Sequence, residues 1–204
     1  MDDPSVLRPV LNVSHETIER LRAFETLLRR WQRKTNLVGS DTLDRYWSHH
    51  VGDAAFLLHA APNVNDWTDI GAGAGLPGLA LGILSADRSA RMRVDLVESN
   101  AKKCAFQRSA VLQLKLREVA DVAIHNERIE DHVCRPDTVL TARALAPLDR
   151  LIDHAKRLGV SRALFLKGER HAEEVAAARQ RHDFDVQTVP HPLTPGSVLL
   201  DLHL

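Results

Sequence analysis

Residues 67–78 read W-T-D-I-G-A-G-A-G-L-P-G, and this stretch decides the fold of the chain. A short apolar run that carries Asp69 breaks into three alternating glycines, Gly71, Gly73 and Gly75, and ends in a Pro-Gly pair that can open a helix. Because glycine has no Cβ, such a strand-to-helix turn lets the backbone approach a ligand closely. The turn therefore predicts a nucleotide-like cofactor.

Two classes of cofactor compete for this turn. The dinucleotide pattern G-x-G-x-x-G is matched by Gly73, Gly75 and Gly78, and it aims backbone N–H groups at a pyrophosphate. Pro77 removes one of these donors, however, and residues 67–84 contain no Lys or Arg. A cofactor without phosphate fits better, and Asp69 offers an acceptor to a positively charged ligand group. S-adenosylmethionine has this chemistry, and a glycine-rich turn without a ligand is the structural alternative.

Composition and cysteine usage set wider bounds. With 204 residues, 44% of them hydrophobic, the chain can bury one well-packed domain, which we expect to be a cofactor-binding unit over 63–204 with a helical extension over 1–62 packed on it. Cys104 and Cys134 form neither a C-x-x-C pair nor a Cys/His cluster, so no disulfide and no metal site are predicted. The start of the chain does not resemble a signal peptide, and no stretch approaches about 20 apolar residues. We expect a soluble, cytoplasmic protein.

The charges balance overall but not locally. The 27 basic and 27 acidic side chains argue against a uniformly basic nucleic-acid binder. Residues 20–34, however, carry six Lys or Arg and one acid, and residues 99–117 carry five and none. Such a run is often only a solvated helix surface. Beside a cofactor turn it also fits a contact surface for RNA or DNA, and both interpretations stay open.

The N-terminal third of the chain predicts helices. Ser14 can cap a helix whose apolar residues recur at helical spacing up to Trp31. Asp41 can cap a second helix that runs to about His59, and Pro62 marks the boundary between this helical part and the rest of the chain.

Beyond Pro62 the chain alternates strands and helices. We expect strands near 67–70, 93–97, 121–125, 138–142, 163–167, 185–189 and 198–203. Helices are expected after Pro77, Asn100, Pro147 and Glu169. This alternation predicts an α/β fold with a doubly wound, mostly parallel sheet of seven strands. The last two strands, joined by the loop 190–196, are expected to form an antiparallel pair at one edge.

Ligands of doubly wound sheets lie beyond the C-terminal ends of the strands, so each strand end holds candidates. Glu98 ends the second strand, where a carboxylate can accept hydrogen bonds from both ribose hydroxyls or favour the next helix through its dipole. After the third strand, Ile129 can pack on adenine and Glu130 can accept from its amine, although an ordinary amphipathic turn is the alternative. Arg143, a charge in an apolar run, should face the cleft or a carboxylate. Lys167 brings a second cation to this edge.

Seven motifs occur in order along nearly the whole chain: N-L-V-G at Asn36, H-x-x-D at His50, D-I-G-A-G-A-G-L-P-G at Asp69, E-S-N-A-K-K-C-A-F at Glu98, R-I-E at Arg128, T-A-R-A-L-A-P-L at Thr141 and L-F-L-K-G at Leu164. Together they resemble the RsmG family, also called glucose-inhibited division protein B. The resemblance implies a class I, Rossmann-like methyltransferase. It also implies methyl transfer from S-adenosylmethionine to N7 of one guanine, position 527 in the usual numbering, in the decoding-region loop of bacterial 16S rRNA.

The resemblance also assigns residues. The cofactor contacts of the family fall on Gly71, Leu76, Ile129, Glu130 and Arg143. The chain departs from many relatives around its H-x-x-D motif, where His49 stands in place of Arg and Ala54 in place of Ser. If those residues serve RNA binding, the RNA contacts of this segment differ.

The implied chemistry limits what a catalytic residue has to do. Guanine N7 has an in-plane lone pair and no proton to lose, so positioning matters and no general base is needed. We therefore assign no catalytic base to any of the 11 histidines, while Arg143 can position both cofactor and base. Phosphate contacts are expected from Lys102, Lys103, Arg108 and Lys167.

The expected partner is 16S rRNA in an open loop, within a precursor or the 30S subunit, bound by a monomer. A methyltransferase for another RNA, a small molecule or a protein is the second hypothesis. A ribosome assembly factor that binds the cofactor without turnover is the third. A nicotinamide-dependent dehydrogenase is a minor alternative.

Overall fold

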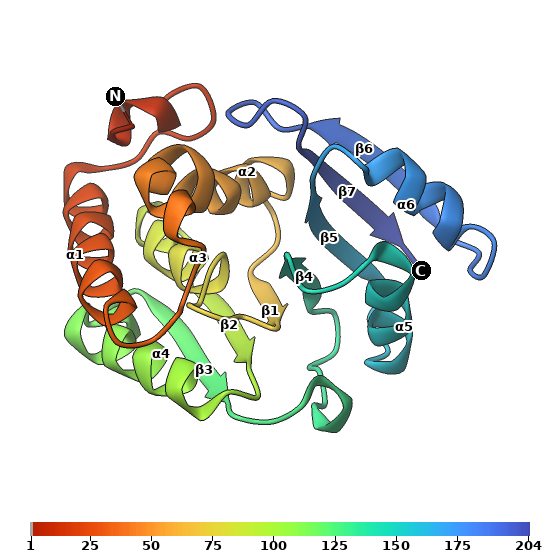
Figure 1. Ribbon diagram of the computed structural model, residues 1–204. Coiled ribbons are helices and arrows are strands. Elements are labelled where there is room, and N and C mark those ends of the chain that lie inside the picture. Colours follow the sequence, from red (N-terminus) through yellow and green to blue (C-terminus); the bar gives the residue numbers. More distant parts are fainter. Residues whose placement is uncertain (1) are drawn as a thin grey trace.

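Seven strands form one sheet in the order β3-β2-β1-β4-β5-β7-β6, with helices on both faces (Figure 1). This computed structural model describes residues 2–204, apart from the side chains of Ser40 and Asp41. The strands are β1 Asp66–Ile70, β2 Met92–Val97, β3 Ala120–His125, β4 Val139–Arg143, β5 Arg162–Lys167, β6 Asp185–Pro190 and β7 Val198–His203. Every predicted strand is confirmed.

The pairing of the strands confirms the predicted sheet. Strands β1 to β5 pair in parallel, whereas β7 is antiparallel to both β5 and β6. The antiparallel pair lies at one edge, as expected from the loop that joins the last two strands. Strands β1 and β4 are neighbours in this order. The chain adds β2 and β3 on one side of β1, and it adds β5 and the later strands on the other side, beyond β4. The C-terminal ends of β1 and β4 therefore open a crevice for a ligand.

Most helices begin where the sequence predicts. Ser14 caps α1 His15–Gln32 by accepting a hydrogen bond from the Thr17 amide, and Asn100 caps α4 Ala101–Gln113 in the same way. The others are α3 Gly78–Leu84, α5 Leu148–Arg157 and α6 His171–Ala178, and short 3₁₀ turns lie at η1 Pro4–Leu7, η4 Ser85–Asp87, η5 Leu116–Glu118 and η6 Ile129–Asp131. In the described part of the chain, no helix has the length and apolar character that a membrane span requires.

The prediction of one continuous helix from Asp41 to about His59 is wrong. The chain forms a 3₁₀ turn η2 Ser40–Arg45, a π-helical turn η3 Tyr46–Val51 and only then α2 Gly52–Ala60. Distant contacts accompany this break: the amides of Trp47 and Ser48 donate to the Asp2 carboxylate, and the Tyr46 hydroxyl donates to the Leu21 carbonyl. The cap expected at Asp41 lies outside the described side chains, and the turn itself begins one residue earlier.

The two faces of the sheet carry separate apolar layers. Helices α1 to α4 share one core, in which Phe24 of α1 stacks on Phe106 of α4 with ring centroids 6.1 Å apart. Helices α5 and α6 cover the other face. The N-terminal helix therefore packs on the same helix that supplies the wall of the ligand crevice.

Candidate functional site

The three alternating glycines all adopt the left-handed backbone conformation that the sequence predicts for a tight turn. Their φ angles are 65° at Gly71, 57° at Gly73 and 73° at Gly75. A Cβ at Gly71 would collide with Leu145, and one at Gly75 would collide with Leu79. Around Gly73 the nearest atom would be 3.8 Å away. Gly71 and Gly75 are therefore required by packing, while Gly73 keeps free space on the crevice side.

Asp69 lies beneath this turn rather than in the crevice. Its Oδ2 accepts a hydrogen bond of 2.9 Å from the Gly78 amide at the start of α3. Burial raises the pKa of the Asp69 carboxyl to about 7. Its second oxygen has no hydrogen-bond partner among the described residues. The observed role is to fix the turn, and a contact with a charged ligand group stays a prediction.

Glu98 lies at the C-terminal end of β2, as predicted, and connects that strand to the glycine turn. Its Oε2 accepts from the Gly73 amide at 2.9 Å and its Oε1 accepts from the Asn100 amide at 2.8 Å. The side chain thus holds both the turn and the start of α4. Each carboxylate oxygen has further lone pairs for ribose hydroxyls.

Gln107 is a site residue that the sequence did not reveal. This fully buried side chain of α4 donates to the Gly73 carbonyl at 2.9 Å. Together with Glu98 it holds the Gly73 residue from both its amide and its carbonyl. The available signal was a polar side chain beside Phe106 on the apolar face of α4.

Two neighbouring cavities open around the turn. One of about 500 Å³ is lined by Gly71, Leu76 and Arg143, among others. The other, of about 480 Å³, is lined by Glu98, Ile129 and Glu130. Gly71, Lys103 and Ala144 line both, so the cavities are adjacent. Their size and their shared wall suit an elongated ligand with a nucleoside at one end and an amino-acid group at the other.

Arg143 meets both of its sequence predictions, since it lines the crevice and pairs with a carboxylate. Its Nη1 donates to Asp53 Oδ2 at 2.9 Å, and His191 Nε2 lies 3.2 Å from Asp53 Oδ1. The Leu193 and Thr194 amides both donate to His191 Nδ1, which places the proton on Nε2, toward Asp53. Burial disfavours an ionised Asp53, but His191 and Arg143 outweigh it and lower its pKa.

The histidines of the H-x-x-D segment are neutral. His50 Nε2 lies 3.1 Å from the Thr42 hydroxyl, and burial, followed by the nearby Arg143 charge, lowers the pKa of His50 to about 2. Burial also lowers the pKa of His49, which lines the larger cavity with Asp53. These side chains shape the cavity without adding positive charge to it.

Lys167 is more constrained than a phosphate-binding lysine would be. Its Nζ donates to the Ala146 carbonyl at 3.0 Å and pairs with Glu174, which also accepts from the Leu148 amide. Only 11% of the Lys167 side chain is exposed. The structure thus gives Lys167 a role in joining β5, α6 and the loop before α5, and its contact with RNA stays a prediction.

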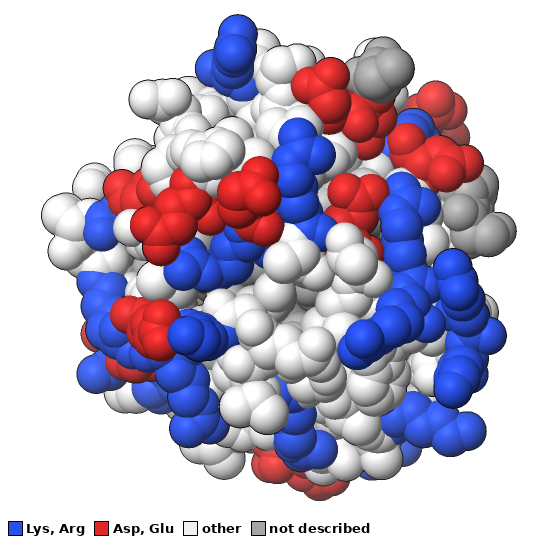
Figure 2. All heavy atoms as spheres, turned by 90° about the vertical axis from the view of Figure 1, so that its left-hand side faces the viewer, with Lys and Arg blue, Asp and Glu red and all other residues white. Residues whose placement is uncertain are grey.

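The two basic segments differ in how their charges are paired. Figure 2 shows Lys and Arg side chains around a mostly neutral area on the face that carries α1 and α4. On α1, Arg20, Arg22 and Arg29 each pair with a glutamate of the same helix, as on a solvated surface. In the described part of the chain, no salt bridge involves Arg30, Arg33 and Lys34 of the first segment, or Lys102, Lys103 and Arg108 of α4. Lys103 also lines both cavities, so helix α4 is the better candidate for phosphate contacts.

The sequence of this chain matches a known protein family. The family model GidB, described as rRNA small subunit methyltransferase G, matches residues 17–195. The chain belongs to this family. The ribosomal RNA small subunit methyltransferase G of Ruegeria sp. (strain TM1040) is 39% identical, over 94% of this chain and 93% of the relative. That of Methylobacterium nodulans is 42% identical, over 87% and 84%. The resemblance seen in the seven motifs is confirmed as membership of the GidB family.

Solved structures confirm the fold. The magnesium protoporphyrin IX methyltransferase of Synechocystis PCC 6803, solved with bound SAM, superposes with a TM-score of 0.61 at 16% identity and covers 94% of this chain and 98% of that one. A methyltransferase from Geobacter sulfurreducens gives a TM-score of 0.56 at 14% identity, over 98% and 94%. This GidB-family chain thus has the doubly wound sheet predicted from its strand pattern and the class I methyltransferase fold that the family resemblance implied.

Proposed function

We propose that this protein transfers a methyl group from S-adenosylmethionine to N7 of one guanine, position 527 in the usual numbering, in the decoding-region loop of 16S rRNA. Its family makes it an S-adenosylmethionine-dependent enzyme of small-subunit rRNA. The target atom and position are the added proposal. The observation that carries it is the pair of cavities that meet at Gly71 beside an exposed, unpaired basic helix.

The residues around the two cavities would hold different parts of the cofactor. Glu98, Ile129 and Glu130 line the smaller cavity and would hold the nucleoside, with the Glu98 carboxylate as the acceptor for ribose hydroxyls. Gly71, Leu76 and Arg143 line the larger cavity and would hold the amino-acid and methyl-bearing part. The cofactor supplies an electrophilic methyl group on a sulfonium sulfur.

The protein's task is to orient the acceptor base. N7 attacks through a lone pair and loses no proton, so no residue has to act as a base. Arg143 is fixed by Asp53, and both line the cavity that would receive the guanine. The Asp53 carboxylate offsets the charge of Arg143 in this cavity, and the neutral His49 and His50 add no further positive charge to oppose the one that the purine gains.

RNA binding completes the proposal. Lys102, Lys103 and Arg108 contact phosphates. Lys167 lines the larger cavity, and it reaches RNA only by leaving Glu174. The substrate is an unpaired loop in 16S rRNA, a subunit precursor or the 30S subunit, because N7 is accessible there. The enzyme acts as a monomer in the cytoplasm.

Methyl transfer to defined RNA tests this function. Purified protein is incubated with labelled S-adenosylmethionine and either naked 16S rRNA, 30S subunits or precursor particles. A matched RNA carries adenine at the proposed position. We expect label only where the guanine is present, and recovery of 7-methylguanosine after digestion. Absence of transfer to all three substrates would contradict the proposal.

A further inference from the structure

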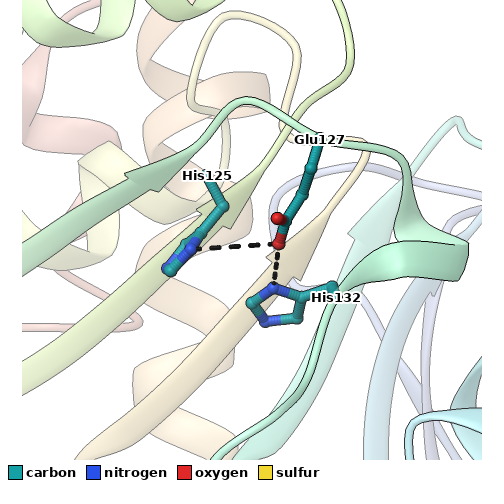
Figure 3. A group of neighbouring side chains, drawn as sticks. All are labelled: His125, Glu127 and His132. Atoms are coloured by element: carbon teal, nitrogen blue, oxygen red, sulfur yellow. Dashed lines mark hydrogen bonds and ion pairs between the residues drawn. The ribbon is translucent and has the colours of Figure 1, made fainter.

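A polar cluster lies in the crossover from β3 to β4, on the sheet face opposite α1 to α4. His125 ends β3, Glu127 lies in the loop after it, and His132 comes directly after η6 (Figure 3). One donor atom from each residue lies within 4.8 Å of the others. The two imidazole rings are 4.7 Å apart, centroid to centroid. The linear spacing H-x-E-x₄-H matches none of the usual zinc motifs, so the sequence predicted no metal site here.

We propose that His125, Glu127 and His132 bind a divalent transition metal ion of the zinc type. Two imidazole nitrogens and one carboxylate oxygen form a donor set that zinc uses with water as a fourth ligand. Glu127 Oε1 lies 2.7 Å from His132 Nδ1 and 4.0 Å from His125 Nδ1. Tetrahedral zinc with bonds of about 2.0 to 2.1 Å needs donors about 3.3 Å apart. The two observed distances bracket this value, so small side-chain rotations complete the site.

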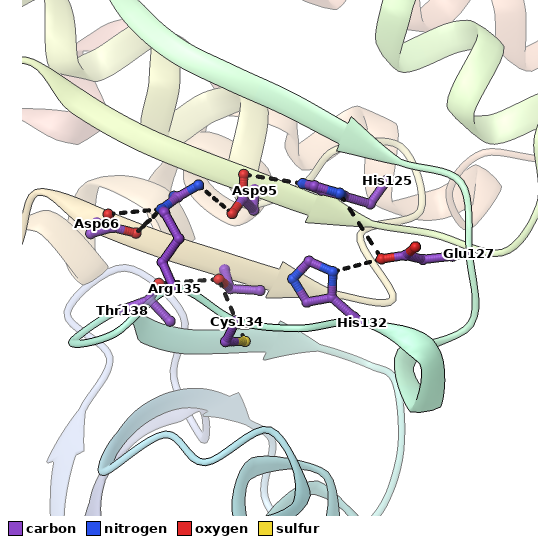
Figure 4. A network of polar contacts seen from close by, with 9 residues as sticks. Asp66, Asp95, His125, Glu127, His132, Cys134, Arg135 and Thr138 are labelled. Atoms are coloured by element: carbon purple, nitrogen blue, oxygen red, sulfur yellow. Dashed lines mark hydrogen bonds and ion pairs between the residues drawn. The ribbon is translucent and has the colours of Figure 1, made fainter.

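The surroundings of His125 provide the second observation. Its other nitrogen, Nε2, lies 3.2 Å from Oδ1 of the buried Asp95. Arg135 in turn pairs with Asp95 and with Asp66 (Figure 4). A histidine that binds metal through one nitrogen commonly donates its other N–H to a carboxylate, which fixes the ring. Asp95 lies within reach of that N–H, and a small rotation of the His125 ring would align the hydrogen bond.

Among the described residues, neither imidazole ring has both of its nitrogens in a hydrogen bond. His125 Nε2 is not aligned for a hydrogen bond with Asp95, and His132 Nε2 has no partner among the described residues. The His132 side chain is 3% exposed. Buried imidazole nitrogens are nearly always paired. His125 Nδ1 lies 4.0 Å from Glu127 Oε1, too far for a hydrogen bond, so it is free to coordinate an ion. Coordination there would place the proton of His125 on Nε2, toward Asp95.

The position of the cluster gives the ion a structural consequence. Between β3 and β4 the described chain forms only the 3₁₀ turn η6, and Glu127 lines the smaller cavity together with Ile129 and Glu130. A metal bound by His125, Glu127 and His132 would close a loop around residues 128–131 and so order Ile129 and Glu130, which line this cavity. This consequence rests on the proposed function, whereas metal binding itself does not.

Metal titration of the full-length, untagged protein tests the site. The protein is stripped with EDTA, dialysed and titrated with ZnCl₂ by calorimetry and with CoCl₂ by visible absorption. We expect one equivalent to bind, with a tetrahedral cobalt spectrum. His125→Gln and Glu127→Gln should each weaken binding at least tenfold, and Asp95→Asn should weaken it by about 10- to 100-fold. The matched control is His15→Gln, an exposed histidine on α1, which should bind like the parent protein.

The outcomes separate a metal site from a hydrogen-bonded cluster. The proposal would be overturned if the parent protein bound no stoichiometric metal, or if His125→Gln and Glu127→Gln bound metal as tightly as the parent. Glu127 would then only bridge the two imidazoles. His125 and Glu127 are each about one third exposed, so we expect both variants to fold. Circular dichroism checks that they fold like the parent before their metal affinities are compared. Metal affinity is measured without methyl transfer, so failure of the proposed function is detected separately.

Discussion

Glu98 accepts a hydrogen bond from the backbone amide of Gly73 at 2.9 Å, so the carboxylate that ends β2 also fixes the turn after β1. Gln107 holds the carbonyl of the same glycine. Because β1 and β2 pair in parallel, their C-terminal ends are adjacent. The hydrogen bonds to Gly73 join these ends into one wall of the ligand crevice. Substitutions in this wall therefore need measurements of both cofactor binding and folding.

Glu98→Ala should weaken binding of S-adenosylmethionine by about 1.5 to 3 kcal/mol, the usual contribution of a charge-assisted hydrogen bond. This corresponds to roughly 10- to 150-fold in the dissociation constant. Calorimetry measures the loss, and the exposed acid Glu118 provides the control variant Glu118→Ala. Unchanged affinity in Glu98→Ala would contradict binding of the nucleoside in the smaller cavity.

Gly73→Val should fold and yet bind cofactor poorly. Its Cβ meets open space, so the variant fills the crevice and strains only the local backbone, at about 1 to 2 kcal/mol for the left-handed conformation. Gly75→Val should instead reduce the melting temperature strongly, since its Cβ collides with Leu79. Thermal melts and calorimetry on the pair measure both effects. Equal loss of stability in the two variants would contradict the distinction.

The fold was predictable because its signals are local. The alternation of strand-like and helix-like segments indicated all seven strands, and Ser14 and Asn100 marked helix starts through their own side chains. The π-helical turn was not predictable, because its amides bind Asp2 across the fold.

The site was predictable only in part, because some of its contacts join residues that are far apart in sequence. Glu98 and Arg143 could be placed because they lie at strand ends. The partner of Asp53, His191, comes from the loop before β7, and nothing near it in sequence indicates that contact. Pairing of Lys167 with Glu174 likewise depends on how α6 packs.

Removing Arg143 should destabilise the fold as well as the site. Asp53 and Arg143 are both largely buried, with 6% and 14% of their side chains exposed. Truncating one partner of a buried ion pair costs about 3 to 5 kcal/mol, since the other charge stays buried. Urea unfolding of Arg143→Ala measures this loss. The double variant Asp53→Leu/Arg143→Met should recover most of the stability, and failure to recover it would contradict the ion-pair explanation.

Asp69 should make folding less favourable as pH rises. Its pKa is about 7 in the folded chain, raised by burial, against about 3.9 in the unfolded chain. The folded state therefore holds the proton more tightly, and this stabilisation is lost between about pH 4 and about pH 7. Asp69→Asn removes the titration, so its stability relative to the parent should rise over that range and level off above it. Urea unfolding at a series of pH values measures the difference, with the exposed Asp183→Asn as control, and a flat difference would contradict the raised pKa.

The salt dependence of RNA binding can test the basic surface of α4. Each phosphate contact with single-stranded RNA contributes about 0.7 to the slope of log K against log salt concentration. Lys102→Gln/Arg108→Gln on α4 should therefore lower the slope by about 1.4. A matched pair of exposed residues, Lys156→Gln/Arg157→Gln at the C-terminal end of α5, lies away from the cavities and should leave the slope unchanged. Filter binding of a decoding-loop RNA over a range of KCl concentrations measures both. An equal change in the two variants would show that the RNA responds to total charge, whereas a change confined to α4 would place the phosphate backbone along the helix that also holds Gly73 through Gln107.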